Sequence, residues 1–120
     1  MRRLLFSLIG LLSLPPAASQ AFDTQGQYAV LGSGTALCST YSQARQAKSY
    51  LVYAAWLTGY LTARNMQSDA TYDLSSRAGL EGMLGWLDTW CKANPTRQFA
   101  AAAYELTIYL YPSRTVRAPR

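Results

Sequence analysis

The sequence contains no histidine, only two cysteines and only six acidic residues among its 120 positions. Without histidine, the chain can form neither a histidine-dependent catalytic triad nor an imidazole zinc site, and no imidazole can shuttle protons. The six carboxylates are explained more simply as solvated helix faces than as the paired acids of a glycosidase. We therefore expect that the protein is not an enzyme and uses no metal ion or other cofactor.

Charge is scarce as well. Charged residues make up 14% of the chain, whereas hydrophobic residues make up 50%. This balance favours a folded domain over a disordered chain, and the length allows one small domain at most. The basic residues are scattered along the sequence, so they form no continuous cationic patch. The exception is the C-terminal tail, where three arginines lie close together.

Residues 1–21 have the pattern of a cleavable signal peptide. Two arginines follow the first methionine, an apolar run of eleven residues occupies 4–14, and two prolines and a group of small residues follow. The apolar run is too short to span a bilayer, which takes about 20 residues. We expect cleavage after Ala21, or alternatively after Ser19, and general secretion rather than twin-arginine export.

Removal of this segment would leave 99 residues with 9 basic and 6 acidic side chains, a net charge of +3. The mature protein is then expected in the periplasm, without stable membrane insertion. Nucleic acid is not an expected partner in that compartment.

Cys38 and Cys91 would meet oxidising conditions after export, where an even number of cysteines favours a disulfide bond. The alternatives are two buried free thiols, or a metal site whose coordination sphere two cysteines without histidine would leave half empty. The bond would close a loop of 54 residues. In the chain-entropy model this closure stabilises the fold by about 4 kcal/mol, and it leaves no thiolate nucleophile.

The mature chain begins with a glycine-containing segment, residues 22–37, in which we expect at most one short strand at 28–31. Its Gly-Ser-Gly-Thr sequence superficially resembles a phosphate-binding loop. The lysine and the further glycine of such loops are missing, so a flexible turn is the simpler interpretation.

The first helix is expected over residues 40–65, with a capping box between Thr40 and Gln43. Leu51 and Trp56 widen the apolar side of this helix. The residues that recur at helical spacing and predict its core-facing stripe are Tyr50, Tyr53, Ala54, Leu57, Tyr60 and Leu61.

The second helix is expected to begin at a cap formed by Ser75 or Ser76 and to end near residue 93. Glycines at positions 79, 82 and 85 weaken it locally, by roughly 0.5–1 kcal/mol each. They indicate either a surface that another helix approaches closely or a segment that loosens easily or receives a partner. The predicted buried stripe consists of Leu80, Leu84, Leu87 and Cys91.

Asn94 as cap and Pro95 as first residue predict the start of a third helix, which Pro112 ends. Residues 112–120 carry three arginines and are expected to be disordered. The predicted fold is therefore all-α: one domain over residues 22–111, a small bundle of three main helices with one disulfide. The stripe of the third helix consists of Phe99, Ala103, Leu106 and Leu110.

Nine tyrosines and three tryptophans exceed what one small core must hide. Either all of them fill the core, or some form a surface for a dimer or another partner, to which these residue types are suited. The candidate partner-binding residues are Tyr53, Trp56, Tyr60, Trp86 and Trp90.

Two segments carry a resemblance to a known family. The sequence Trp-Leu-Asp-Thr-Trp-Cys-Lys-Ala-Asn-Pro surrounds Cys91, and Cys38 precedes a helix with the run Trp-Leu-Thr-Gly-Tyr-Leu at 56–61. Both resemble the two cysteine segments of the HdeA/HdeB periplasmic acid-stress chaperones, over roughly residues 32–110. The same outline also resembles the Tai-type immunity proteins, which neutralise type VI secretion amidases in the periplasm.

The first resemblance implies a stress-response chaperone: a dimer that dissociates and loosens in strong acid and holds unfolding clients on apolar surface. Six acids leave this chain few groups to titrate, so the resemblance implies the fold more strongly than the acid response. The second resemblance implies an inhibitor that occludes one secreted cell-wall amidase, for instance through residues 65–73. In both cases the expected partner is a protein or an unfolded client, and a second copy of the chain is a further candidate.

Overall fold

The structure is a computed structural model that describes residues 22–75 and 77–120, so the expected signal peptide lies outside the described residues. The α-helices are α1 (Cys38–Gln46), α2 (Leu51–Gln67), α3 (Gly79–Ala93) and α4 (Phe99–Leu110), and 3-10 turns lie at η1 (Gly32–Thr35) and η2 (Tyr111–Ser113). No strand forms in this part of the chain, where isolated bridges pair Leu37 with Gln98 and Asp73 with Thr115. The all-α prediction is confirmed, with four helices instead of three.

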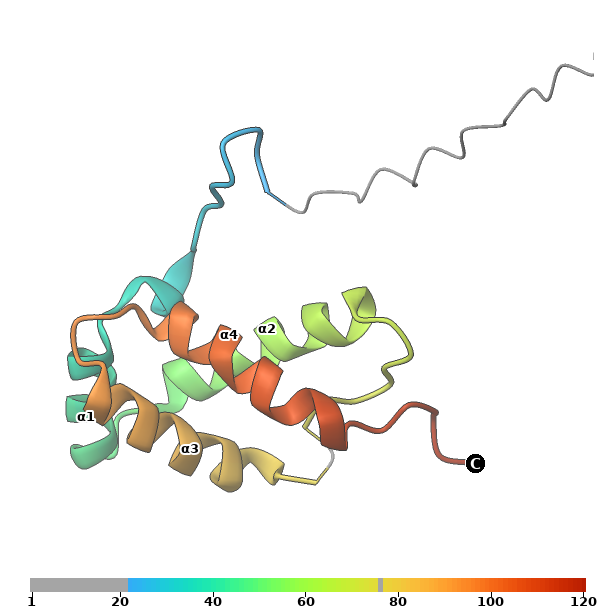
Figure 1. Cartoon of the computed structure of the whole chain (residues 1–120). Helices are drawn as coiled ribbons and strands as arrows, with labels where there is room; N and C mark the ends of the chain where they lie inside the picture. Colours follow the sequence, from blue (N-terminus) through green and yellow to red (C-terminus); the bar gives the residue numbers. More distant parts are fainter. Residues whose placement is uncertain (1–21, 76) are drawn as a thin grey trace, which may run out of the picture.

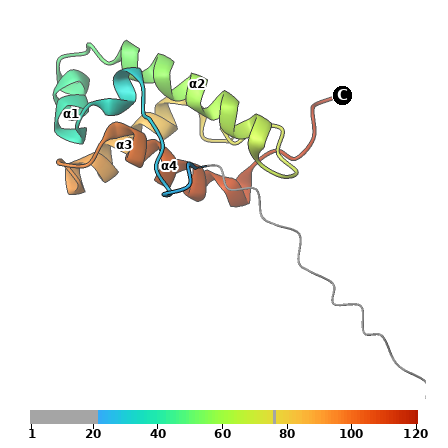
Figure 2. The ribbon, with the colours of Figure 1, turned by 90° about the horizontal axis from the view of Figure 1, so that it is seen from above.

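Helix α4 lies in the middle of the bundle, between α2 and α3, and α1 packs against α3 at one end (Figure 1). Seen from above, α2 forms one layer and α3 with α4 the other (Figure 2). The predicted stripe of α4 is buried as expected, and that of α2 is buried at four positions, Tyr53, Ala54, Leu57 and Leu61. Leu51, at the first position of α2, is instead exposed.

The single helix expected over residues 40–65 is wrong, because the chain turns at Lys48. The Ser49 N–H donates to the carbonyl of Ala44 at 2.9 Å, and the Lys48 N–H donates to that of Arg45 at 3.2 Å. These two bonds form a Schellman motif, in which the residue at the turn adopts the left-handed conformation. Lys48 has a φ of 57°. Glycine is usual at such a position, so lysine gave no signal for the end of a helix.

Backbone carbonyls cap the start of α1, and the predicted capping box at Thr40 is wrong. The Cys38 N–H donates to the carbonyl of Arg97 at 2.8 Å, and the Ser39 N–H donates to that of Pro95 at 3.0 Å. Both acceptors lie in the turn between α3 and α4. Thr40 is the third residue of the helix and is exposed.

Asn94 ends α3 and does not begin the next helix. Its side-chain Nδ2 donates to the carbonyl of Trp90 at 2.9 Å, while α4 begins only at Phe99. The turn between them includes Pro95, whose carbonyl is occupied by α1. The Asn-Pro pair therefore marks the end of α3, and the predicted start of a helix at Asn94 is wrong.

Helix α3 begins at Gly79, later than the predicted serine cap. The backbone N–H and the hydroxyl of Ser75 both donate to the carboxylate of Asp73, at 2.8 Å each, which fixes the loop before the helix. The alternative cap, Ser76, lies outside the described residues.

The buried side of α3 differs from the prediction at one position. Leu80 is 40% exposed, and Met83 is buried in its place. A Cβ atom at Gly82 would meet only Ala78, at 3.6 Å, and one at Gly85 would meet nothing within 4 Å. None of the other helices in the described part of the chain approaches these glycines. The interpretation that they form a surface for close approach of another helix is therefore wrong within the described residues.

Cys38 and Cys91 form the predicted disulfide, with Cα atoms 4.8 Å apart. Both residues are fully buried. The bond joins the first residue of α1 to the last turn of α3. It therefore holds together two elements that are far apart in the sequence.

The chain after η2 packs against the loop before α3. Arg114 Nε donates to the carbonyl of Ala70 at 3.1 Å, and the guanidinium lies 3.8 Å from the centroid of the Tyr111 ring. The backbone of Thr115 pairs with that of Asp73. These contacts place the first residues of the basic tail, for which the sequence predicts disorder, against the bundle.

Replacing Cys38 or Cys91 with Ser should lower the free energy of unfolding by about 2–5 kcal/mol, because the unfolded chain gains the freedom that the bond removes. Urea unfolding of the oxidised protein and of each variant measures the change. Reduction of the wild type is the matched control and should have a similar effect. An unchanged melting temperature after reduction would contradict this role.

Lys48→Gly should raise the free energy of unfolding by about 1 kcal/mol, since glycine adopts the left-handed conformation without strain. Ala47→Gly is the matched control: Ala47 has an ordinary helical φ of −79°. Glycine there should lower the free energy by roughly 0.5–1 kcal/mol. Urea unfolding of the three proteins compares them, and a Lys48→Gly protein no more stable than wild type would disprove the strain.

Candidate functional site

Helix α4 is apolar around nearly its whole circumference. Glu105 is its only charged residue. A helix with this composition is normally covered on all sides, but here one side is open. The residues buried on the other side are Phe99, Ala102, Ala103, Leu106, Thr107 and Leu110.

The open side of α4 carries large exposed side chains. Tyr104 is 47% exposed, Ile108 53% and Tyr109 61%, and Tyr111, just after the helix, is 40% exposed. In Figure 1 no other helix lies in front of α4. We call the surface formed by Tyr104, Glu105, Ile108, Tyr109 and Tyr111 the α4 face. It combines four large apolar groups with one charge.

Two of the predicted partner-binding residues extend the α4 face onto α3. The Trp86 ring stacks on Tyr109, with centroids 5.5 Å apart and an angle of 27° between the planes. Trp90 lies one turn further along and lines a small hollow of about 240 Å³ with Trp86 and Thr89. Both indoles are partly buried, so each still presents an edge to solvent.

Two further predicted residues lie between α2 and α4. The rings of Trp56 and Tyr60 stack with centroids 5.3 Å apart and an angle of 8°. Burial raises the pKa of the Tyr60 hydroxyl above its ordinary value, while the nearby Arg64 cation opposes the shift. Tyr60 also interacts with Thr107 and Tyr104, so this pair adjoins the α4 face.

Trp56 holds the segment that precedes α1. Its Nε1 donates to the carbonyl of Leu31 at 2.7 Å, and a Cβ atom added at Gly34 would overlap the indole. The Gly-Ser-Gly-Thr sequence therefore forms an ordered 3-10 turn on the indole, and the flexible turn expected there is wrong. Residues 28–31 run into it without forming a strand.

The remaining predicted residue, Tyr53, lies in the core. It is 7% exposed, and its ring packs against Tyr41 at 5.3 Å and Phe99 at 5.2 Å between centroids. Its side chain is therefore not part of a surface of the folded chain.

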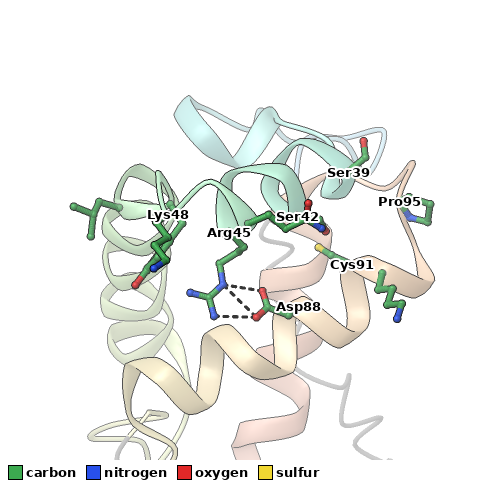
Figure 3. Close-up of a pocket in the computed structure, with 11 residues that line it drawn as sticks. Ser39, Ser42, Arg45, Lys48, Asp88, Cys91 and Pro95 are labelled. Atoms are coloured by element: carbon green, nitrogen blue, oxygen red, sulfur yellow. Dashed lines mark hydrogen bonds and ion pairs between the residues drawn. The ribbon is translucent and has the colours of Figure 1, made fainter.

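A second candidate site is a hollow of about 1000 Å³ with a mixed lining, between α1, the start of α2 and α3 (Figure 3). Arg45 donates from Nε and Nη2 to the two oxygens of Asp88, at 2.9 Å each. The Tyr41 hydroxyl donates to the same carboxylate at 2.9 Å. Burial, and then this hydrogen bond and the negative charge of Asp88, raise the pKa of Tyr41 far above its ordinary value.

No pattern in the sequence indicates this second site. Arg45 and Asp88 are 43 positions apart and belong to no motif. They meet because the disulfide lays α1 along α3. The 4.5 Å contact of the guanidinium with the Tyr50 ring depends equally on the turn at Lys48.

No family model, curated protein or solved structure matches this chain. Among the described residues, no group of three or more cysteine, aspartate or glutamate side chains could hold a metal ion. None of the helices of the described chain is long and apolar enough to cross a membrane.

Gly34→Ala should lower the free energy of unfolding by about 1–3 kcal/mol, because the added methyl group displaces Trp56 from its place against η1. Gly59→Ala is the matched control, since a Cβ atom at Gly59 in α2 would meet nothing within 4 Å. This change should raise the free energy by roughly 0.5–1 kcal/mol. Urea unfolding followed by tryptophan fluorescence measures both, and equal effects would refute the packing of Gly34 on Trp56.

Proposed function

We propose that this chain is an exported, disulfide-bonded protein that binds other proteins through the α4 face, as a holdase of the HdeA/HdeB type. One observation carries the proposal: Tyr104, Ile108 and Tyr109 are exposed together on a helix with a single charge. Aromatic side chains with few neighbouring charges characterise the centres of protein-binding surfaces.

The chemistry of the α4 face suits clients of varied sequence. Burial of apolar surface is non-directional and needs no matching hydrogen bonds. The phenol groups of Tyr104 and Tyr109 can in addition satisfy polar groups of a client at the edge of a contact. Such a surface recognises exposed apolar segments in general, which is the property that a holdase needs.

An ion pair and the disulfide both link α1 to α3. Among the described residues, Arg45 and Asp88 form the one salt bridge, at 2.9 Å, and it links α1 to α3. Because the disulfide joins the same two helices, loss of other contacts between them would loosen the fold without separating them.

In acid at about pH 2–3, the purified mature chain should suppress the light scattering of an acid-unfolding client, and at neutral pH it should not. Tyr104→Ser combined with Ile108→Ser should lose most of the suppression. Burial of each side chain against a client contributes about 1.5–3 kcal/mol. Titration of the chain against a fixed client concentration measures the loss.

The matched control is Val52→Ser combined with Met66→Ser, which removes apolar side chains that are 58% and 83% exposed on α2. This control should retain the suppression of the wild type. Equal losses in both variants would contradict the α4 face as the binding surface. No suppression by the wild type at either pH would contradict the holdase.

The alternative function, inhibition of a secreted cell-wall amidase, is favoured by the bracing of the loop after α2. Asn65 Oδ1 accepts the Leu74 N–H at 2.9 Å, and Arg114 donates to the carbonyl of Ala70. A loop fixed in advance loses little entropy when it enters a cleft, which suits tight binding to one target. Inhibition of such an amidase by a one-to-one complex would select this function over the holdase.

A further inference from the structure

The hollow beside the disulfide has an excess of positive charge. Its walls carry the cations of Arg45, Lys48 and Lys92 but only one carboxylate, that of Asp88. Glu81 adds a weaker negative charge at Arg45 and does not line the hollow. The remaining wall is mixed, with hydroxyl groups from two serines and apolar surface from tyrosine, leucine and proline.

Arg45 is held in one orientation, with one end unused. Asp88 occupies Nε and Nη2, and the Tyr50 ring lies 4.5 Å from the guanidinium carbon. The free end of the guanidinium is turned toward the side of the hollow on which Lys48 lies (Figure 3). Because its orientation is already fixed, Arg45 could bind an anion with little further loss of side-chain entropy.

Lys48 stands at a position where lysine is unfavourable for the fold. Its φ of 57° belongs to the left-handed region, and the Schellman motif around it is one that glycine fits without strain. Strained residues of this kind gather at binding sites, where the side chain has a use that offsets the strain. Lys48 lines the hollow.

We propose that this hollow binds a carboxylate of an acidic, partly apolar polypeptide segment, between the free end of Arg45 and Lys48. The inference rests on the proposed function, in that the segment belongs to a protein that the chain binds. It adds a site for an acidic side chain, lined by α1, α2 and α3, to the apolar α4 face.

The size and composition of the hollow favour a peptide over a small free anion. A volume of about 1000 Å³ exceeds what a phosphate or a single carboxylate fills and accommodates several residues. Tyr50, Leu51 and Pro95 supply apolar surface beside the cations. A segment in which glutamate alternates with leucine matches both parts of the wall.

The test is a titration of the purified mature chain with a short capped peptide of alternating glutamate and leucine, followed by amide chemical shifts in NMR. Residues of α1 and the last turn of α3 should shift. Lys48→Gly should weaken the affinity by about tenfold, the usual loss for one charge-assisted hydrogen bond. The same variant should have a higher melting temperature, so weaker binding could not be ascribed to poor folding. Lys48→Arg should restore the affinity.

Two controls separate a site from general attraction of charges. Arg77→Gln removes one exposed cation at the other end of α3 and should leave the affinity unchanged. A peptide with glutamine in place of glutamate should bind at least about tenfold more weakly. Equal weakening by Lys48→Gly and Arg77→Gln would overturn the proposal, and so would inorganic phosphate that binds as tightly as the peptide and displaces it.

The light-scattering assay distinguishes failure of this inference from failure of the proposed function. A wild type that suppresses aggregation but does not bind the acidic peptide would overturn the hollow as a site and leave the holdase intact. A wild type that binds the peptide at the hollow but suppresses no aggregation would support the site and contradict the holdase.

Discussion

The disulfide between Cys38 and Cys91 determines where α1 lies, and much of the remaining arrangement depends on it. With the two Cα atoms 4.8 Å apart, the start of α1 is held against the last turn of α3. The turn between α3 and α4 then supplies the carbonyl groups that cap α1. From there α1 runs along α3, which brings Tyr41 into the core and Arg45 to Asp88. The chain must change direction to lay α2 beside α4, and it does so at Lys48.

The features that depend on the buried faces of helices could be predicted from the sequence. The stripe of α4 and most of that of α2 follow from the spacing of apolar residues, because each helix buries one side against the same core. The disulfide could be predicted because the expected export would place the two cysteines in an oxidising compartment, where they have few alternatives. What the spacing could not reveal was the open side of α4, since Tyr104 and Ile108 are as apolar as the residues buried behind them.

The features that depend on contacts between distant segments could not be predicted. The sequence offered Thr40, Ser75 and Asn94 as caps, yet backbone groups cap α1 and Asn94 serves the end of α3. Local preferences for caps are worth about 1 kcal/mol, so tertiary packing readily overrides them. Gly34 is a similar case: a glycine in a polar turn indicates flexibility, but here it lets the backbone lie against the Trp56 ring. The need for glycine at this position becomes visible only when α2 is in place, because Trp56 belongs to that helix.

Helix α3 takes part in both candidate sites and contains three glycines, which weaken a helix. Trp86 borders the α4 face, while Asp88 and Lys92 line the hollow, so one helix connects an apolar surface with a positively charged hollow. Its C-terminal turn is anchored by the disulfide, whereas its N-terminal half contains the exposed glycines and is held by packing and by one hydrogen bond, from the Tyr41 hydroxyl to the carbonyl of Leu84. Any loosening of α3 would therefore begin at its N-terminal end. Because Met83 and Leu84 are buried there, such loosening would uncover further apolar surface beside Trp86.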